Sequence, residues 1–350
     1  MMKTEIIRID NVNDIGADLK HAAEIIKNGG LVIFPTETVY GLGGNALDSF
    51  ASKKIYEAKG RPQDNPLIIH IAAPEDASLY TYTNDIYTKL AKRFMPGPLT
   101  VILPVKDCIP KETRASLPTV AVRCPLHPIA RKLIELSGVP IAAPSANLSG
   151  SPSPTKASHV IDDMMGRVDV IIAADDAEIG LESTIVKIED NGALTLLRPG
   201  KITVDELREV CPDIKIASAV TSQIKEGETV LSPGMKYRHY APKAPVILLD
   251  GNSDAIATYI TENTKGKKAA AICYKEDIET IKEKTPDLFI YEFGEKDNEE
   301  IQARLLFDIL READKRNFDV IYAPLPKQEG VGLALYNRMI RAAAYNIIKL

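Results

Sequence analysis

Hydrophobic and polar residues in the first two hundred positions follow two periods, one helical and one extended. Apolar residues recur at three- and four-residue spacing over residues 15–27, with Asn13 or Asp14 as the cap and Gly29-Gly30 as the stop. Short apolar runs bounded by turn formers predict buried strands. We expect helices over residues 15–27, 48–58, 85–94, 128–136 and 204–210, and strands over residues 1–10, 31–34, 67–71, 99–103, 120–123, 139–142, 168–173, 183–188 and 194–197.

Beyond Pro245 the pattern becomes a regular alternation of strands and helices. We expect strands over residues 246–249, 269–273, 288–291 and 320–322, and helices over residues 253–261, 275–284, 298–315 and 331–345. This alternation predicts a small parallel sheet covered by helices, a Rossmann-like arrangement. The first strand-to-helix turn lacks the glycine fingerprint of a dinucleotide site, so we expect no dinucleotide there.

The length of 350 residues suggests two domains, at about 150 residues per domain. Residues 94–154 contain 11 prolines, so this part must be rich in shaped loops, which often line a site. Residues 212–242 show weak periodicity and many turn formers, which is typical of a linker. We therefore predict an α/β fold with domains over residues 1–211 and 243–350, joined by a linker over residues 212–242.

Composition and charge exclude several classes of protein. Hydrophobic residues make up 45% of the chain and charged residues 26%, which is typical of a globular protein with a full core. No apolar run approaches the roughly 18 residues that span a bilayer. Acidic residues exceed basic ones, 48 against 43, which argues against bulk nucleic-acid binding. Four scattered cysteines and a charged start without an apolar signal segment predict a cytoplasmic protein with reduced thiols.

Polar clusters follow several expected strands and provide the candidate chemistry. They occupy residues 35–43, 59–66, 123–125, 145–147, 182–184 and 198–200. Lys59 and Arg61 stand at a helix end, where solvated cations are the ordinary interpretation, although cations held between prolines can also be pre-organised for phosphate or carboxylate. Ser145 and Asn147 can either cap a turn or hold a phosphate oxygen. No P-loop, zinc-protease, nucleophile-elbow or calcium-loop motif is present.

In this order and spacing, the clusters resemble the Sua5/YrdC/YwlC family of threonylcarbamoyl-AMP synthases, in the long Sua5 form with a C-terminal Sua5 domain. The matching segments are PTETVYGL at residues 35–42, the K-x-R of Lys59 and Arg61, PGPLT at 96–100, the S-x-N of Ser145 and Asn147, ESTIV at 182–186, LRPG at 197–200, and residues 232–242, which begin with SPGM. The resemblance implies a YrdC-like twisted open α/β sheet for the first domain.

The resemblance also implies an activity. Family members are nucleotidyltransferases that condense L-threonine, bicarbonate or CO2, and ATP to L-threonylcarbamoyl-AMP and pyrophosphate. The product serves t6A modification of adenosine 37 in ANN-decoding tRNAs through a tRNA threonylcarbamoyl transferase of the Kae1/TsaD type, which is the expected downstream partner. Any contact of this chain with tRNA would be indirect. Mg2+ is the expected cofactor, held mainly by the ATP phosphates rather than by a protein metal site.

Site residues follow by family position. Lys59 and Arg61 are the expected catalytic cations. The expected ATP-binding residues are Lys59, Arg61, Asn65, Thr119, Ser145, Asn147, Ser153, Arg198, Arg238 and His239, and the expected threonine-binding residues are Thr36, His70, Arg123 and Ser183. On sequence alone His70 is better explained as a structural histidine in an apolar run, and the resemblance reverses that preference. Glu182 is interpreted as an ordinary strand-end charge.

Two other functions were weighed, and one of them remains as an alternative at this point. The first is a double-stranded RNA-binding module of the same fold, whose binding would fall steeply with salt. The second is a hydrogenase-maturation-type carbamoyl transferase, which the absence of C-x-x-C pairs removes. Two tyrosines, Arg238 and His239 are costly to leave mobile in a linker. We therefore expect residues 212–242 to fold back over the active site as a lid that excludes water.

Overall fold

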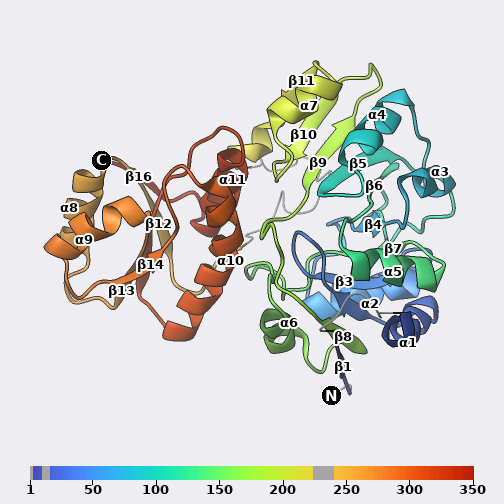
Figure 1. Cartoon of the computed structure of the whole chain (residues 1–350), viewed down its shortest axis with the longest axis horizontal. Coiled ribbons are helices and arrows are strands. Elements are labelled where there is room, and N and C mark those ends of the chain that lie inside the picture. Colours follow the sequence, from blue (N-terminus) through green and yellow to red (C-terminus); the bar gives the residue numbers. More distant parts are fainter. Residues whose placement is uncertain (1–2, 10–15, 224–239) are drawn as a thin grey trace. The chain divides into compact units, whose positions relative to one another are not determined.

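The computed structural model describes residues 3–9, 16–223 and 240–350, which form two compact units (Figure 1). The described part of the first unit contains residues 3–9, 16–149 and 153–223. The second unit contains residues 150–152 and 240–350. No helix within the described ranges is long and apolar enough to cross a membrane.

A mixed sheet of eleven strands forms the centre of the first unit, as far as it is described. In spatial order its strands are β1 (Glu5–Arg8), β8 (Val170–Ala173), β2 (Val32–Phe34), β3 (Gly41–Asn45), β7 (Ile141–Ala142), β4 (Ile68–His70), β6 (Thr119–Arg123), β5 (Leu99–Pro104), β9 (Thr184–Ile188), β10 (Leu194–Arg198) and β11 (Ile214–Ile216). Strands β4 and β6 pair in parallel, whereas β5 pairs with β6 antiparallel and with β9 in parallel. This mixed pairing brings segments that are distant in sequence to one part of the sheet.

Helices cover this sheet and complete the core of the first unit. They are α1 (Gly16–Lys27), α2 (Ser49–Lys59), α3 (Ala77–Tyr80), α4 (Asp85–Phe94), α5 (Pro128–Ser137), α6 (Ala157–Met164) and α7 (Val204–Val210). Leu19 and Ile26 of α1 and Leu133 of α5 bury their side chains with Val32 and Val170 of the sheet. Burial of such an apolar helix face is the main source of helix stability in a globular protein.

The second unit has a parallel sheet of five strands in its described residues, in the order β14 (Phe289–Glu292), β13 (Ala269–Cys273), β15 (Val320–Pro324), β12 (Val246–Asp250) and β16 (Ile347–Lys349). Its helices are α8 (Ser253–Asn263), α9 (Ile278–Lys284), α10 (Glu299–Arg316) and α11 (Gly332–Ala342). Figure 1 shows α8 and α9 on one face of this sheet and α10 and α11 on the other. The Rossmann-like expectation is confirmed.

Five described strands and α-helices were not expected from the pattern: β3, β11, β16, α3 and α6. Strand β3 has the sequence GLGGN, and its glycines suggested a loop. A Cβ atom at Gly43 would stand 2.7 Å from side-chain atoms of both Phe34 and Ile141. Glycine is therefore required because two large neighbours cover this strand, and the local sequence alone does not show such packing.

Strand β11 lies inside the segment that we expected to be linker. It pairs in parallel with β10, with Leu194 opposite Ile214, and the short 3₁₀ helix Ser218–Val220 follows it. Residues 212–223 are therefore part of the first unit, and the expected linker beginning at residue 212 needs this correction. The strand was missed because three residues between turn formers are too few to show a period.

Candidate active site

A row of buried polar side chains crosses neighbouring strands of the first unit. His70 at the end of β4 is in register with Arg123 at the end of β6, and Arg123 is in register with Thr100 of β5. The Thr100 and Ser183 hydroxyl oxygens lie 2.8 Å apart in a hydrogen bond. The expected threonine-binding residues His70, Arg123 and Ser183, which are far apart in sequence, are thus brought together, and their binding role stays a prediction. Thr100 joins them and was not anticipated.

Arg123 forms a buried ion pair with Glu37, which sequence analysis did not single out for a role. A guanidinium nitrogen of Arg123 lies 2.6 Å from Glu37 Oε1, and both side chains are 5% exposed. Glu37 Oε2 also accepts a hydrogen bond from the Leu126 N–H at 3.1 Å. The only available signal for Glu37 was a carboxylate inside an otherwise uncharged strand-end motif.

The electrostatics of this pair follow from its burial. Desolvation alone would raise the pKa of the Glu37 carboxyl, but the Arg123 charge, its hydrogen bond and backbone N–H groups outweigh desolvation and lower the pKa. Arg123 also has a buried Nε that finds no hydrogen-bond acceptor within the described structure. A buried donor without a partner costs free energy, so this position favours a ligand that supplies an acceptor.

His70 is a neutral imidazole in this site. Burial, followed by the positive charge of Arg123, lowers the pKa of His70 to about 3. Its Nδ1 lies 3.2 Å from the Ile68 carbonyl oxygen, which can only accept a hydrogen bond. His70 can therefore exchange hydrogen bonds with a ligand at neutral pH, but it cannot act as a cation.

Thr36 shapes the loop that carries Glu37. Its hydroxyl donates to the Val39 carbonyl oxygen at 2.6 Å and accepts from the Thr38 and Val39 N–H groups at 3.2 Å. These local bonds form a tight turn between β2 and β3. In this structure, Thr36 therefore helps to hold the loop in addition to its expected place near threonine.

Arg198, which we expected to contact ATP, donates hydrogen bonds to Ser183 in this structure. Its guanidinium donates to the Ser183 carbonyl oxygen and hydroxyl oxygen, both at 3.0 Å. The chain turns sharply at Gly200, where a Cβ atom would stand 2.5 Å from the Thr184 backbone nitrogen. The LRPG turn thus packs against the start of β9 and places Arg198 where it orients Ser183. Its expected contact with ATP remains a prediction.

A second cluster contains the expected phosphate-binding residues. The Lys59 ammonium group at the end of α2 donates hydrogen bonds to the Ser145 and Asn147 carbonyl oxygens, and the Ser145 hydroxyl donates to Asn147 Oδ1 at 2.6 Å. Arg61 donates to the Asn65 and Pro66 carbonyl oxygens, both at 3.2 Å. The K-x-R and S-x-N motifs, which are 86 residues apart at their first members, therefore form one cluster.

Strand β7 lies between the two clusters. It pairs with β4, which ends at His70, and the chain continues from β7 so that the Ala143 N–H bonds to the Ile68 carbonyl oxygen at 2.9 Å. Ser145 then forms an isolated bridge with Gly41. The row around Arg123 and the Lys59 cluster thus belong to one continuous part of the sheet.

The other residues expected to bind ATP are Ser153, Thr119, Arg238 and His239, and they lie in different parts of the chain. Ser153 donates to Glu182, and Glu182 is 5% exposed, so our interpretation of Glu182 as an ordinary strand-end charge is wrong. Thr119 begins β6 while Arg123 ends it, which separates them by about 13 Å along an extended strand. An elongated ligand is therefore needed to contact both. Arg238 and His239 lie outside the described residues, as does most of the expected lid.

No group of three or more histidine, cysteine, aspartate or glutamate side chains in the described ranges is arranged to hold a metal ion. The candidate site instead combines buried cations, hydroxyl groups, a neutral histidine and one carboxylate. With its large mixed sheet and its second, parallel α/β unit, the chain falls into a class of two-domain α/β proteins with a site for small polar, charged molecules.

Comparison with known proteins identifies the family. Residues 24–200 match the Sua5/YciO/YrdC family model, described as "Telomere recombination", and residues 202–344 match the model described as "Threonylcarbamoyl-AMP synthase, C-terminal domain". The chain belongs to the threonylcarbamoyl-AMP synthase family, in its two-domain Sua5 form. The resemblance inferred from the motifs is thereby confirmed.

Individual relatives match over nearly the full length. The threonylcarbamoyl-AMP synthase of Pyrococcus abyssi is 46% identical over 340 residues, covering 95% of this chain and 95% of that protein. The Bacillus subtilis protein of the same name is 41% identical over 355 residues, covering 99% and 100%. A crystal structure of P. abyssi Sua5 complexed with L-threonine matches with a TM-score of 0.88 and 43% identity, covering 100% of this chain and 99% of that one.

Proposed function

We propose that this chain is an L-threonylcarbamoyl-AMP synthase, a nucleotidyltransferase that makes threonylcarbamoyl-AMP and pyrophosphate from L-threonine, bicarbonate or CO2, and ATP. Relatives of that name match along the whole chain, and a similar structure holds L-threonine. The observation that carries the proposal is the buried Arg123–Glu37 pair, with a donor of Arg123 left without an acceptor.

This pair suits a free amino acid. Threonine is a zwitterion, with a carboxylate and an ammonium group on one carbon. Arg123 can bind the carboxylate through its guanidinium, including the Nε that lacks an acceptor. Glu37 can then accept hydrogen bonds from the ammonium group, so charge balance in the buried site is preserved. We propose that His70 and Ser183 exchange hydrogen bonds with the threonine hydroxyl.

The Lys59 cluster suits the ATP phosphates. Carbonyl groups hold both Lys59 and Arg61 in fixed positions, so their positive charge is already in place near the expected phosphates. Asn65 Oδ1 is buried without a hydrogen-bond partner in the described structure, which makes it an acceptor for a nucleotide hydroxyl or amino group. Ser145, Asn147, Ser153, Thr119 and Arg198 are proposed to complete the ATP site, together with Arg238 and His239.

The reaction then needs two steps. The threonine ammonium group first loses one proton; the resulting neutral amine adds to CO2 and loses a second proton, which gives a carbamate. A carbamate oxygen attacks the α-phosphorus of ATP, and the bond to pyrophosphate breaks in line with the attack. The protein contributes mainly position and positive charge. Mg2+, bound chiefly through the phosphates, would supply further charge neutralisation.

Pyrophosphate release tests the proposal. We expect release from ATP only when L-threonine and bicarbonate are both present, and we expect no release when either is omitted. Release without threonine would contradict the assignment. The alternative, a double-stranded RNA-binding module, has no support in the comparisons and would show salt-sensitive RNA binding without any pyrophosphate release.

The wider role follows from the product. A threonylcarbamoyl-AMP is a reactive mixed anhydride, so a second enzyme must accept its acyl group. We propose a tRNA threonylcarbamoyl transferase of the Kae1/TsaD type as that partner, acting in the cytoplasm.

A further inference from the structure

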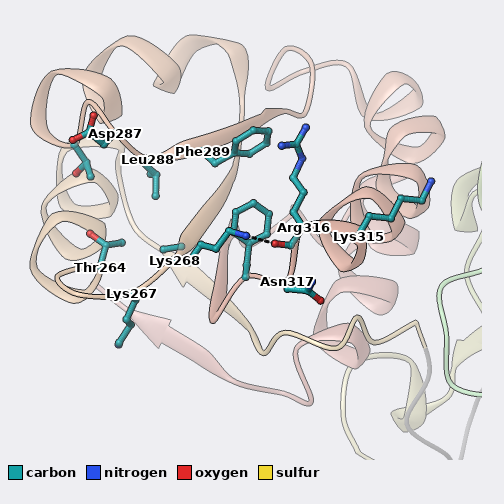
Figure 2. Close-up of a pocket in the computed structure, with 12 residues that line it drawn as sticks. Thr264, Lys267, Lys268, Asp287, Leu288, Phe289, Lys315, Arg316 and Asn317 are labelled. Atoms are coloured by element: carbon teal, nitrogen blue, oxygen red, sulfur yellow. Dashed lines mark hydrogen bonds between the residues drawn. The ribbon is translucent and has the colours of Figure 1, made fainter.

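The second unit contains a cavity of about 620 Å3 that the proposed function does not use (Figure 2). It lies at the edge of the sheet where β13, β14 and β15 begin, beside the last turn of α10. Ligand pockets of small molecules typically occupy about 300–1,000 Å3, so this cavity is large enough for a molecule of nucleotide size.

Basic side chains dominate the walls of this cavity. Lys267, Lys268, Lys315 and Arg316 line it, against the single carboxylate of Asp287. Lys315 forms an ion pair with Glu312 at 2.8 Å. The other three cations have no carboxylate within 4.0 Å among the described residues. The residues that line the cavity therefore carry more positive than negative charge, four cations against one carboxylate.

Aromatic rings and a carbonyl group hold two of these cations in place. The Arg316 guanidinium lies 4.3 Å from the centre of the Phe289 ring, and the Lys268 ammonium lies 5.6 Å from the centre of the Phe318 ring. Lys268 also donates to the Arg316 carbonyl oxygen, as Figure 2 shows. These contacts fix the cations but leave N–H groups for an anion, because a ring face does not cancel their charge.

A helix end explains only part of this arrangement. Arg316 stands in the last turn of α10, where the helix dipole stabilises a positive charge. Lys267 and Lys268 precede β13 and belong to no helix, so the dipole does not account for them. Cations from two separate segments, residues 267–268 and 315–316, line one cavity next to the Phe289–Phe318 ring pair, whose centres are 5.6 Å apart.

We propose that this cavity binds a nucleotide, with its phosphate on Lys267 and Lys268 and its base against the flat surface of Arg316 and Phe289. Phosphate on lysine together with a base beside arginine and aromatic groups is the usual chemistry of single-strand recognition. In Figure 2 Asp287 lies across the cavity from Arg316, where its carboxylate accepts hydrogen bonds from a base amino group or a ribose hydroxyl. The nucleotide can be free or part of an RNA strand.

Hydrogen–deuterium exchange of the full chain locates such binding. The probes are AMP, a single-stranded RNA oligonucleotide and inorganic phosphate. We expect AMP, RNA or both to slow exchange in residues 264–269 and 315–318, beyond any effect of phosphate. Because these peptides lie in the second unit, AMP bound at the Lys59 cluster is recorded separately, so this result does not depend on the synthase assignment.

Two matched variants complete the test. The pocket variant Lys267→Gln/Arg316→Gln should weaken binding of the probe that protects these peptides by about tenfold or more. The control Lys275→Gln/Lys282→Gln makes the same charge change on another face of the second unit and should leave binding unchanged; thermal unfolding checks that both variants fold. Protection by RNA alone assigns the cavity to an RNA nucleotide, whereas protection by AMP shows that a free nucleotide suffices. No protection by either, or equal protection by phosphate, would overturn the proposal.

Discussion

The Arg123–Glu37 pair is almost closed to water, with both side chains 5% exposed. At such a site, removal of one charge leaves the other buried without compensation. We predict that Glu37→Gln lowers the free energy of unfolding by about 3–5 kcal/mol and raises the threonine KM more than the ATP KM. Chemical denaturation and steady-state kinetics measure the two effects.

A matched control comes from the partly exposed Lys187–Glu189 pair. Glu189→Gln makes the same chemical change where water screens the charges, so it should cost less than about 1 kcal/mol. Equal losses in the two variants would show that burial of the Glu37 pair has no energetic consequence.

His70 makes the stability of the protein depend on pH. Its pKa is lowered to about 3 in the folded protein from an ordinary value of 6.5, because burial and then the Arg123 charge oppose protonation. As pH falls below 6.5 the unfolded chain binds a proton that the folded chain does not, so stability is lost towards pH 3. Between pH 7 and pH 4 we predict a loss of about 3 kcal/mol from this group alone.

The variant His70→Gln removes this proton and should show a flatter pH dependence of unfolding over the same window. The stability that Glu37 contributes, through a pKa lowered from 4.5, is lost only from about pH 4.5 downward, at the acidic end of this window, and this loss is expected in both proteins. Identical pH slopes for parent and variant would disprove the neutral, buried state of His70.

At the scale of elements, the end of α2 positions the cations of the second cluster. Gly60 caps this helix in a left-handed conformation with φ of 62°, between Lys59 and Arg61. A Cβ atom there would meet nothing within 4 Å, so Gly60→Ala costs only the strain of that conformation, about 1–2 kcal/mol. Because Gly60 lies between Lys59 and Arg61, relief of this backbone strain would shift the two cations relative to each other. We therefore also predict a higher KM for ATP.

Gly138 provides the control for this prediction. It caps α5 with φ of 66°, and a Cβ atom there also meets nothing within 4 Å. Gly138→Ala should lower stability by a similar amount without changing the ATP KM. If both variants affect the ATP KM equally, the cap of α2 has no special role in positioning the cations.

Most elements were predictable from the sequence, and the exceptions share a physical cause. Apolar periodicity revealed the long helices and buried strands, and motif order revealed the family. Strand β3 was missed because its glycines make room for the large side chains of Phe34 and Ile141. These two residues belong to other strands, so the local sequence of β3 does not reveal the contact. The partners of Glu37 and Arg198 were missed for the same reason, since a sequence does not show which charges meet across a sheet.

At the scale of the molecule, the boundary of the first unit decides which fragment can fold. Residues 214–216 pair with β10, and Ala219 packs in a cluster with Ile68 and Leu197. We predict that a chain ending at residue 223 folds cooperatively, whereas one ending at residue 201 loses β11 and the buried Leu207 and is markedly less stable. Thermal unfolding of the two fragments distinguishes them.

Activity of the longer fragment tests the lid that the sequence analysis expects over residues 212–242. A chain ending at residue 223 lacks Arg238 and His239, so pyrophosphate release should be much weaker than in the full chain, or uncoupled from threonine. Full activity with unchanged ATP affinity would show that residues beyond 223 act only as a spacer.

Arg123 is the proposed anchor of the threonine carboxylate and the centre of the proposed amino-acid site. The most direct measurement is the threonine KM for pyrophosphate release in Arg123→Lys, compared with the parent protein at saturating ATP and bicarbonate. Lysine keeps the charge but cannot supply the paired N–H groups of a guanidinium, so we predict that the threonine KM rises by about 10- to 100-fold while the ATP KM changes little. An unchanged threonine KM would contradict the assignment of this buried row as the amino-acid site.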